Sequence, residues 1–329
     1  MIGQIFKKGE NMLRKFLVLA CATGALMAAN IKMDLNAVYG ATNFHTKGAE
    51  QFAALVDEYT KGSVKITVHA GGSLVKGNAL QAVKDGTVAM TDMFIPFTAG
   101  GGKVFGISAL PFVAKSYDDA YKLYQISKPA YDKTAAQWNQ KMLYAVSWPP
   151  SGLYTKKAMV TKADFGDLKT RTYDKNSAEF ITMVGGSSVA LPWGEVYSAL
   201  STGMVNSVVT SSASGKDGKF WEVLSDFTKI NYAYPMQAVT INLDYWKSLD
   251  KAQQEALLKA ADKIEKSQWD ASKNEDAAAL KLLSDNGMKI SEPSDGLKKE
   301  LDIVAQKMLD AYLADADESI KKIFTQYKK

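Results

Sequence analysis

The sequence predicts an α/β protein built from two domains, and three observations support this prediction. The chain of 329 residues is about twice the ~150 residues of a typical single domain. Strands alternate with helices in two successive series, and the segment 149–152 (Pro-Pro-Ser-Gly) separates them and is the candidate first crossover between the domains. One long helix is predicted over 251–283, and a helix of that length can span both domains.

The first series lies between residues 33 and 148. Helical spacing of Phe52 and Val56 predicts a helix over 45–60, and strict alternation of apolar and polar residues predicts a strand over 64–68. The same criteria predict strands at 33–39, 89–95 and 142–148 and helices at 80–85 and 117–141. A glycine run and a Leu-Pro-Phe sequence indicate a loop over 97–112. The alternation predicts a parallel sheet.

The second series begins after the crossover. It is predicted to contain strands at 168–173, 188–191, 205–210, 228–232 and 236–242 and helices at 177–184 and 193–201. Leu301, Val304 and Met308 mark a terminal helix. The strand at 236–242 is expected to return the chain to the first domain. The first domain, lobe I, is thus predicted at 30–148 with 237–276, and lobe II at 149–236 with 277–329.

The N-terminus has the pattern of an exported protein. A basic segment at 12–15 precedes an apolar run at 16–29 that is too short to span a membrane, so residues 1–29 are predicted to be a signal peptide. We therefore expect a periplasmic protein. Cys21 follows Val-Leu-Ala as in a lipoprotein box, but the apolar run before it is short, so plain export is favoured over a lipid anchor. Cys21 is the single cysteine.

Residues that could support catalysis, metal binding or nucleic-acid binding are sparse. The two histidines, His45 and His69, are too few and too far apart for a histidine zinc site. The run at 100–106 departs from Gly-x-Gly-x-x-Gly because Phe105 replaces the third glycine. The net charge of +5 is small and evenly spread. We expect no cofactor, no metal, no nucleic-acid partner and no enzymatic activity.

Arg171 stands out by composition. Among 40 Lys and Arg residues only Arg14 and Arg171 are arginine, and Arg14 belongs to the predicted leader. Any positive surface can be built from lysine, whereas a planar guanidinium makes two parallel hydrogen bonds to a carboxylate. Arg171 is therefore a candidate anion-binding residue. The alternative is a structural arginine in a buried ion pair.

Several segments match the pattern of one family. The segment 164–171 (Asp-Phe-Gly-Asp-Leu-Lys-Thr-Arg) is similar to the family sequence Asp-Leu-Lys-Gly-Leu-Lys-x-Arg, and 192–205 contains Glu-Val-Tyr-Ser-Ala-Leu-Ser-Thr-Gly-Met-Val. Further matches lie at 48–53, 60–66, 83–90, 110–112 and 185–186. In their order and spacing these segments resemble the DctP-type solute-binding receptors of tripartite ATP-independent periplasmic (TRAP) transporters, over essentially the whole mature chain.

The resemblance implies a two-lobed fold like that of periplasmic binding proteins, with α/β lobes that close over an organic anion and deliver it to TRAP membrane permease subunits. It also places the family's carboxylate-binding arginine on Arg171. Two departures narrow the ligand. Thr210 stands where the family has a site asparagine, with Ser211 beside it, and the family's second arginine falls near Ser151. A single arginine favours a small monocarboxylate with an uncharged or aromatic remainder.

Aromatic residues occur at predicted strand ends or in loops, where the cleft of an open α/β sheet lies. They are Phe44, Phe94, Trp148, Tyr154, Tyr173, Trp193 and Trp221. Tyr173 and Trp193 are the leading candidates for walls of the site, with core packing as the alternative for each. His45 is expected either to offer a hydrogen-bond donor to the site or to occupy a helix N-cap or surface position.

Two other functions remain open from the sequence. An exported α/β enzyme acting on an organic acid would need a general base near Arg171, and Glu195 is the only nearby candidate. Glu195 also suits a helix N-terminus, where negative charge is favoured. A two-lobed receptor for amino acids or sugars would need an acidic residue for an ammonium group, or several polar and aromatic residues for hydroxyls.

Overall fold

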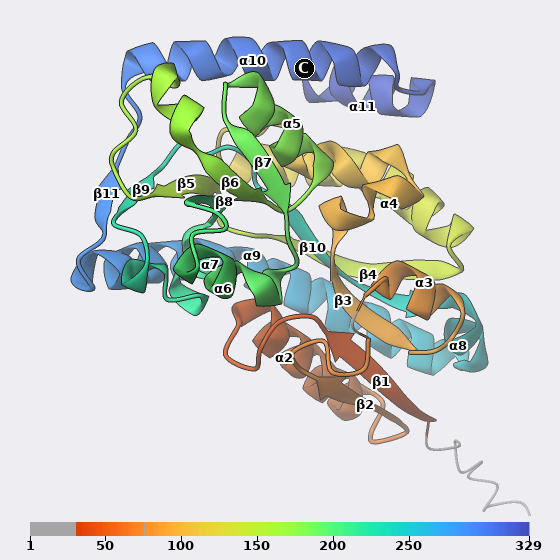
Figure 1. Ribbon diagram of the computed structural model, residues 1–329. Coiled ribbons are helices and arrows are strands. Elements are labelled where there is room, and N and C mark those ends of the chain that lie inside the picture. The colour runs from red at the N-terminus through yellow and green to blue at the C-terminus, as the bar shows by residue number, and fades with distance from the viewer. Residues whose placement is uncertain (1–30, 76, 329) are drawn as a thin grey trace, which may run out of the picture.

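The computed structural model describes residues 31–75 and 77–328 and contains two β-sheets (Figure 1). The five-stranded sheet has the order β2-β1-β3-β10-β4, and the six-stranded sheet has the order β11-β9-β5-β8-β6-β7. We call the first sheet with its packed helices lobe I and the second sheet with its packed helices lobe II. The predicted two-lobed α/β fold is confirmed. The predicted signal peptide at 1–29, with Cys21, lies outside the described residues.

The strands of lobe I are β1 (Ile31–Ala37), β2 (Val64–His69), β3 (Met90–Phe94), β4 (Gln140–Ser147) and β10 (Met236–Asn242). Its helices are α2 (Phe44–Tyr59), α3 (Ala79–Lys84), α4 (Tyr117–Gln137) and α8 (Leu243–Ser248). β1 pairs with β2 and β3 in parallel, but β10 is antiparallel to both β3 and β4. The prediction of a purely parallel sheet is therefore wrong, because β10 enters the sheet from lobe II in the opposite direction.

The strands of lobe II are β5 (Ser151–Thr155), β6 (Lys169–Thr172), β7 (Ser187–Ala190), β8 (Ser207–Ser211), β9 (Asp226–Thr228) and β11 (Lys289–Ser291). Its short helices are α5 (Lys175–Met183), α6 (Val196–Ser201) and α7 (Ser212–Asp217). β6 is parallel to β7 and β8, while β5 is antiparallel to β8 and β9. Both sheets are thus mixed, and each places the carboxyl ends of several parallel strands at one edge.

Two segments connect the lobes and lie side by side. Trp148 N donates to Pro235 O at 2.8 Å, and Ser151 N donates to Ala233 O at 2.9 Å. The strand predicted at 228–232 ends at Thr228, because the following residues form this crossing. β4 ends at Ser147 and β5 starts at Ser151, so Trp148, Pro149 and Pro150 separate the strands. Here Gly152 is needed for space, since a Cβ at this position would lie 2.3 Å from the Phe227 ring.

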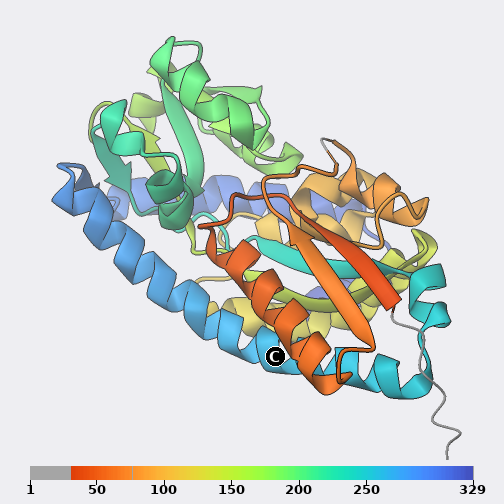
Figure 2. The same ribbon diagram turned by 90° about the horizontal axis from the view of Figure 1, so that it is seen from below.

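Helix α9 (Lys251–Asp285) is the predicted long helix and crosses both lobes (Figure 2). It contacts α2 and β4 in lobe I and α7 and β11 in lobe II. Its 35 residues correspond to about 52 Å of helix. Trp269 Nε1 donates to Ala145 O at 3.1 Å and fixes the helix to β4. Among the described residues, no helix is both long and apolar enough to cross a membrane.

The C-terminal helices pack on different lobes. α10 (Asp295–Ala314) contacts α5, and its apolar residues join a lobe II core. α11 (Glu318–Tyr327) instead contacts α4, and Ile320, Ile323 and Phe324 join the lobe I core. The predicted lobe boundaries stay a proposal, and within the range 277–329 assigned to lobe II, α11 packs on lobe I.

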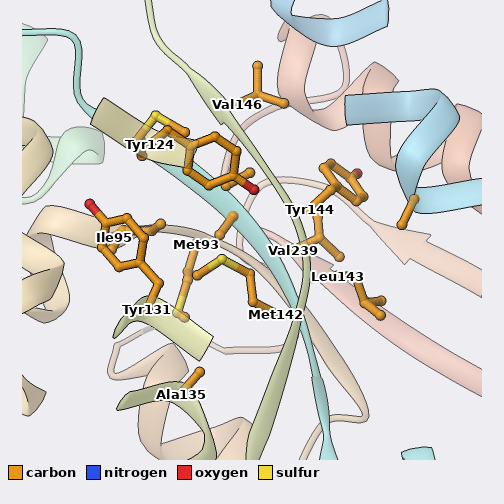
Figure 3. Close-up of a cluster of buried hydrophobic side chains, with 14 of the residues drawn as sticks. Met93, Ile95, Tyr124, Tyr131, Ala135, Met142, Leu143, Tyr144, Val146 and Val239 are labelled. Carbon is orange, nitrogen blue, oxygen red and sulfur yellow. The ribbon is translucent and has the colours of Figure 1, made fainter. Parts of the chain in front are cut away.

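The segment 97–112, expected to be a loop, contains two 3₁₀ helices, η1 (Ile95–Gly101) and η2 (Lys103–Ala109). Short 3₁₀ helices carry little sequence periodicity, which explains why the prediction is wrong. Ile95 of η1 and Phe105 of η2 belong to the lobe I core, part of which Figure 3 shows. There Tyr124 and Tyr131 of α4 lie on one side of the strands and Tyr144 on the other, where its ring lies 5.5 Å from that of Phe52 in α2.

Candidate functional site

Arg171 lies on β6 and is buried, with 6% of its surface exposed. Its Nε and Nη2 atoms both donate to Leu191 O, at 3.1 and 2.9 Å. Parallel pairing of Arg171 with Val189 places this carbonyl, one residue beyond β7, beside the guanidinium. The sequence therefore folds locally so that one edge of the guanidinium is held in a fixed orientation.

The electrostatic surroundings of Arg171 are unusual for a buried cation. Burial lowers the pKa of Arg171 to about 10, so the group stays charged at neutral pH. Tyr39, Tyr173 and Asp174 act in the opposite direction at longer range. Within the described chain Arg171 forms no salt bridge of 4.0 Å or less. The described residues therefore do not place Arg171 in a buried ion pair, which was the alternative interpretation.

Lobe I presents an aromatic cluster around Trp148. The centroid of the Trp148 ring lies 4.8 Å from Tyr39, 5.4 Å from Phe44 and 4.5 Å from His45. Tyr39 follows the carboxyl end of β1, while Phe44 and His45 form the first turn of α2. The structure therefore brings three of the predicted site residues together, with Tyr39 as an addition.

His45 has a buried, neutral side chain. Asn43 occupies the N-cap of α2, and its Oδ1 accepts from His45 N at 2.9 Å. Burial lowers the pKa of His45 well below its usual value. The Nε2 atom is buried without a hydrogen-bond partner among the described residues. The N-cap and surface alternatives for His45 are therefore wrong, and its ring is a candidate polar group of the site.

The two lobes also contact each other directly. The rings of Phe94, at the end of β3, and Tyr173, just after β6, meet edge to face at 5.3 Å. The Tyr173 hydroxyl lies 3.3 Å from Ser151 Oγ at the crossover. Asn43 Nδ2 of lobe I also donates to Asp217 Oδ2 of lobe II at 2.8 Å. Predicted residues from both lobes and from the crossover thus meet at one place.

Tyr39 lies within electrostatic range of charged groups in both lobes. Burial of its hydroxyl raises the pKa of Tyr39, the charge of Arg171 lowers it, and Asp92 and Asp217 raise it further. The hydroxyl therefore lies within electrostatic range of a cation in lobe II and of carboxyl groups in both lobes. The sequence prediction missed Tyr39, Asp92 and Asp217, although Tyr39 follows a predicted strand in the same way as Phe94.

Three further predicted site residues, Ser211, Trp193 and Thr210, lie in lobe II. Ser211 caps α7, since its Oγ accepts from Ser214 N at 3.1 Å. Trp193 is half-buried and its ring lies 6.0 Å from Phe220 in a lobe II core, as the core-packing alternative predicts. Thr210 is buried on β8 with 6% of its surface exposed.

Two further observations limit the chemistry of the site. Glu195, the only candidate base for an enzyme, is exposed and lies at the start of α6. Among the described residues, no group of three or more His, Cys, Asp or Glu side chains is placed to hold a metal ion. What the site offers is a fixed cation, aromatic walls and buried polar atoms. Such a site can bind a small anion between two lobes.

The fold and the site together define a two-lobed α/β solute-binding protein. The model of the bacterial extracellular solute-binding protein family 7 (DctP) matches residues 35–315. The chain belongs to this family. The resemblance to TRAP solute receptors is therefore confirmed, and the matched family consists of receptors rather than enzymes.

Solved structures show how similar the whole chain is to TRAP receptors. A marine metagenome TRAP solute-binding protein specific for pyroglutamate is 33% identical with a TM-score of 0.88, over 91% of this chain and 99% of that one. Bordetella pertussis DctP6, an extracytoplasmic solute receptor binding pyroglutamic acid, is 32% identical with a TM-score of 0.87, over 90% and 99%. The C4-dicarboxylate-binding protein DctP of Rhodobacter capsulatus is 26% identical, over 73% and 74%.

Proposed function

We propose that this protein is an extracytoplasmic receptor that binds a small monocarboxylate with an uncharged cyclic remainder, with pyroglutamate as the leading candidate, and delivers it to TRAP membrane permease subunits. The observation that carries the proposal is the guanidinium of Arg171, which is buried, oriented by Leu191 O and without an ion-pair partner among the described residues. A buried cation without a counter-ion is costly, and a ligand carboxylate would supply the missing charge.

The similarity to pyroglutamate receptors supports this ligand class. The marine protein and DctP6, both above 30% identity, bind pyroglutamate. Pyroglutamate has one carboxylate and a neutral lactam ring. This is the ligand type expected from one arginine and from the serine at position 151, where many family members carry a second arginine. A dicarboxylate would leave its second charge without a cation in this site.

The proposed binding mode uses both lobes. Arg171 would hold the carboxylate with N–H groups that Leu191 does not occupy, as charge-assisted hydrogen bonds. Rings from both lobes, namely Tyr39, Phe44, Phe94, Trp148 and Tyr173, would enclose the apolar part of the ligand. Contacts from two lobes favour the closed arrangement and would drive closure as a population shift. We propose Thr210, Ser151 and His45 as polar neighbours, and Ser211 and Trp193 as supports.

Titration calorimetry tests the proposal. We expect one pyroglutamate to bind per chain. A C4-dicarboxylate should bind at least about tenfold more weakly, because burying its second carboxylate without a cation costs more than the extra contacts of that carboxylate contribute. Incubation with the same acids should leave them chemically unchanged. Absence of pyroglutamate binding would contradict the ligand assignment, and turnover of the acid would favour the enzyme alternative.

A further inference from the structure

Lobe I contains a group of unpartnered polar atoms under α2. The atoms are Asp92 Oδ2, Tyr144 OH and Gln237 Nε2, each buried without a hydrogen-bond partner among the described residues. Strand pairing brings them together, because Val239 of β10 pairs with Asp92 on one side and Tyr144 on the other. Gln237 is two residues before Val239 and therefore shares its face of the sheet. The Gln237 amide lowers the pKa of Asp92 and therefore lies close to its carboxyl, but neither Gln237 Nε2 nor Asp92 Oδ2 makes a hydrogen bond of 3.5 Å or less among the described residues. Buried polar atoms are normally satisfied, so this group requires an explanation.

This group adjoins the aromatic cluster of the site. Gln237 Oε1 accepts from Trp148 Nε1 at 3.1 Å, which orients the Gln237 amide. The Trp148 ring lies 4.8 Å from Tyr39, whose hydroxyl is within electrostatic range of both Asp92 and Arg171. Asp92 and Arg171 are thus both within electrostatic range of Tyr39, one from each lobe.

The Asp92 carboxyl is maintained at an energetic cost. Only 2% of its surface is exposed, and burial raises the pKa of Asp92 to about 7, which the Gln237 amide partly offsets. Tyr39 and Tyr144 are within electrostatic range of Asp92, and among the described residues no cation shifts the pKa of Asp92. A strongly perturbed acid in a binding region is a candidate functional group.

We propose that Asp92, oriented by Gln237, accepts a hydrogen bond from an N–H or O–H group at the uncharged end of the ligand while Arg171 holds the carboxylate. Asp92 is then the specificity-determining residue that selects acids whose remainder carries a hydrogen-bond donor, such as a lactam N–H. This inference rests on the proposed function. A site that offers a buried acceptor discriminates strongly against an analogue that lacks the donor, because the acceptor is then left unpaired.

Proton linkage gives the proposal a distinct signature. A donor favours the ionised form of Asp92, so binding lowers the pKa of Asp92 and releases protons at and just below about pH 7. Affinity for the donor acid therefore increases as the pH rises towards about 7 and then levels off. His45, which contacts Trp148, stays neutral in this range because burial holds its pKa well below the usual value.

The experiment compares pyroglutamate with its lactone analogue, in which a ring oxygen replaces the N–H. Calorimetry of the wild-type protein should show a preference for the lactam of about 10- to 100-fold, the effect of one hydrogen bond to a charged group. In Asp92→Leu the preference should fall to within about threefold. Thr91→Val is the matched control: Thr91 is buried next to Asp92 but points its Oγ1 to Asn36 O, so this variant should keep the preference.

Each outcome has a defined meaning. Equal binding of both acids to the wild-type protein, or an unchanged preference in Asp92→Leu, would overturn the proposed role of Asp92 but leave the proposed function standing. If neither acid binds the wild-type protein, the proposed function falls and this inference falls with it. If Asp92→Leu does not fold, Asp92→Asn decides by proton release: calorimetry in buffers of different ionisation enthalpy should detect release near pH 7 in the wild type and none in this variant. Release by both proteins would overturn the proposal.

Discussion

The proposed site pairs a buried charged side chain of lobe II, Arg171, with one of lobe I, Asp92, and the two differ in how they are held. Arg171 of lobe II is fixed by two hydrogen bonds to Leu191 O and keeps its charge, with a pKa of about 10. Asp92 of lobe I has an Oδ2 atom without a hydrogen-bond partner among the described residues, and burial raises its pKa to about 7, so it can lose its charge near neutral pH. The comparison indicates that lobe II supplies a constant charge, while lobe I supplies a polar group that responds to the ligand.

The largest expected effect comes from removing the constant charge. In Arg171→Leu the ligand carboxylate would be buried without a cation, and truncating one partner of a buried charge pair costs about 2–5 kcal/mol. We expect affinity for pyroglutamate to fall by at least about 30-fold. Calorimetry measures this loss, with unchanged circular dichroism as the control for folding. A variant that still binds within a fewfold of the wild type would show that the carboxylate lies elsewhere.

In lobe I, removing the charge of Asp92 is expected to increase the stability of the ligand-free protein. The folded-state pKa of Asp92 is raised from 3.8 to about 7. Ionisation of Asp92 therefore does not destabilise the folded state below about pH 4. The destabilisation grows as the pH rises above that value and is complete above about pH 7. Asp92→Asn should thus be more stable than the wild type by up to about 4 kcal/mol at about pH 8, and equally stable near pH 4.

Denaturant unfolding of the ligand-free proteins at both pH values checks this prediction. Thr91→Val, on the same strand, should keep the pH dependence of the wild type. Asp174 does not interfere with the comparison, because burial raises its pKa to about 6 in all three proteins alike. Loss of stability in Asp92→Asn at about pH 8 would mean that Asp92 is a structural residue.

A smaller effect tests the contact between the lobes. Tyr173→Phe removes the hydroxyl that lies 3.3 Å from Ser151 Oγ but keeps the ring that packs on Phe94. One hydrogen bond is worth about 1 kcal/mol, so affinity should fall by about fivefold. Tyr232→Phe is the control, because the Tyr232 hydroxyl is buried in lobe II without a partner among the described residues. Equal effects of the two substitutions would contradict a specific role for Tyr173.

The smallest effect is expected at Asn43, which links α2 to Asp217 across the lobes. Asn43→Ser retains an N-cap for α2 but is too short to reach Asp217, so stability should hardly change. Affinity should fall by about two- to threefold, because closure loses one contact. Thermal unfolding and calorimetry of the same samples separate the two quantities. A large drop in melting temperature would assign Asn43 to folding rather than closure.

Much of lobe I follows from local sequence patterns. The alternation of apolar and polar residues at 64–68 and the helical spacing of Phe52 and Val56 depend on one element at a time, and β2 and α2 form where they were predicted. The direction of β10 did not follow from its own sequence, because it depends on the path of the chain through the other lobe. The end of β9 at Thr228 depends in the same way on pairing between the two crossing segments.

The candidate site was predictable only in part. Arg171 was singled out by its rarity and by its chemistry, both of which the sequence contains. Tyr39 and Gln237 join the proposed site through contacts with Trp148, which is distant from both in the sequence. Asp92 gave a signal that was overlooked, since a charged residue inside an apolar strand is seldom buried without a reason. Trp193 shows the reverse case, in which a conspicuous aromatic residue packs on a core.

The central claim is that the guanidinium of Arg171, and not merely its positive charge, binds the carboxylate of the ligand. Calorimetry of Arg171→Lys with pyroglutamate tests this claim directly, because lysine keeps the charge but cannot form two parallel hydrogen bonds. We predict that the affinity of the folded variant falls by more than about tenfold, about 1.4 kcal/mol of binding free energy. An affinity close to that of the wild type would contradict the account.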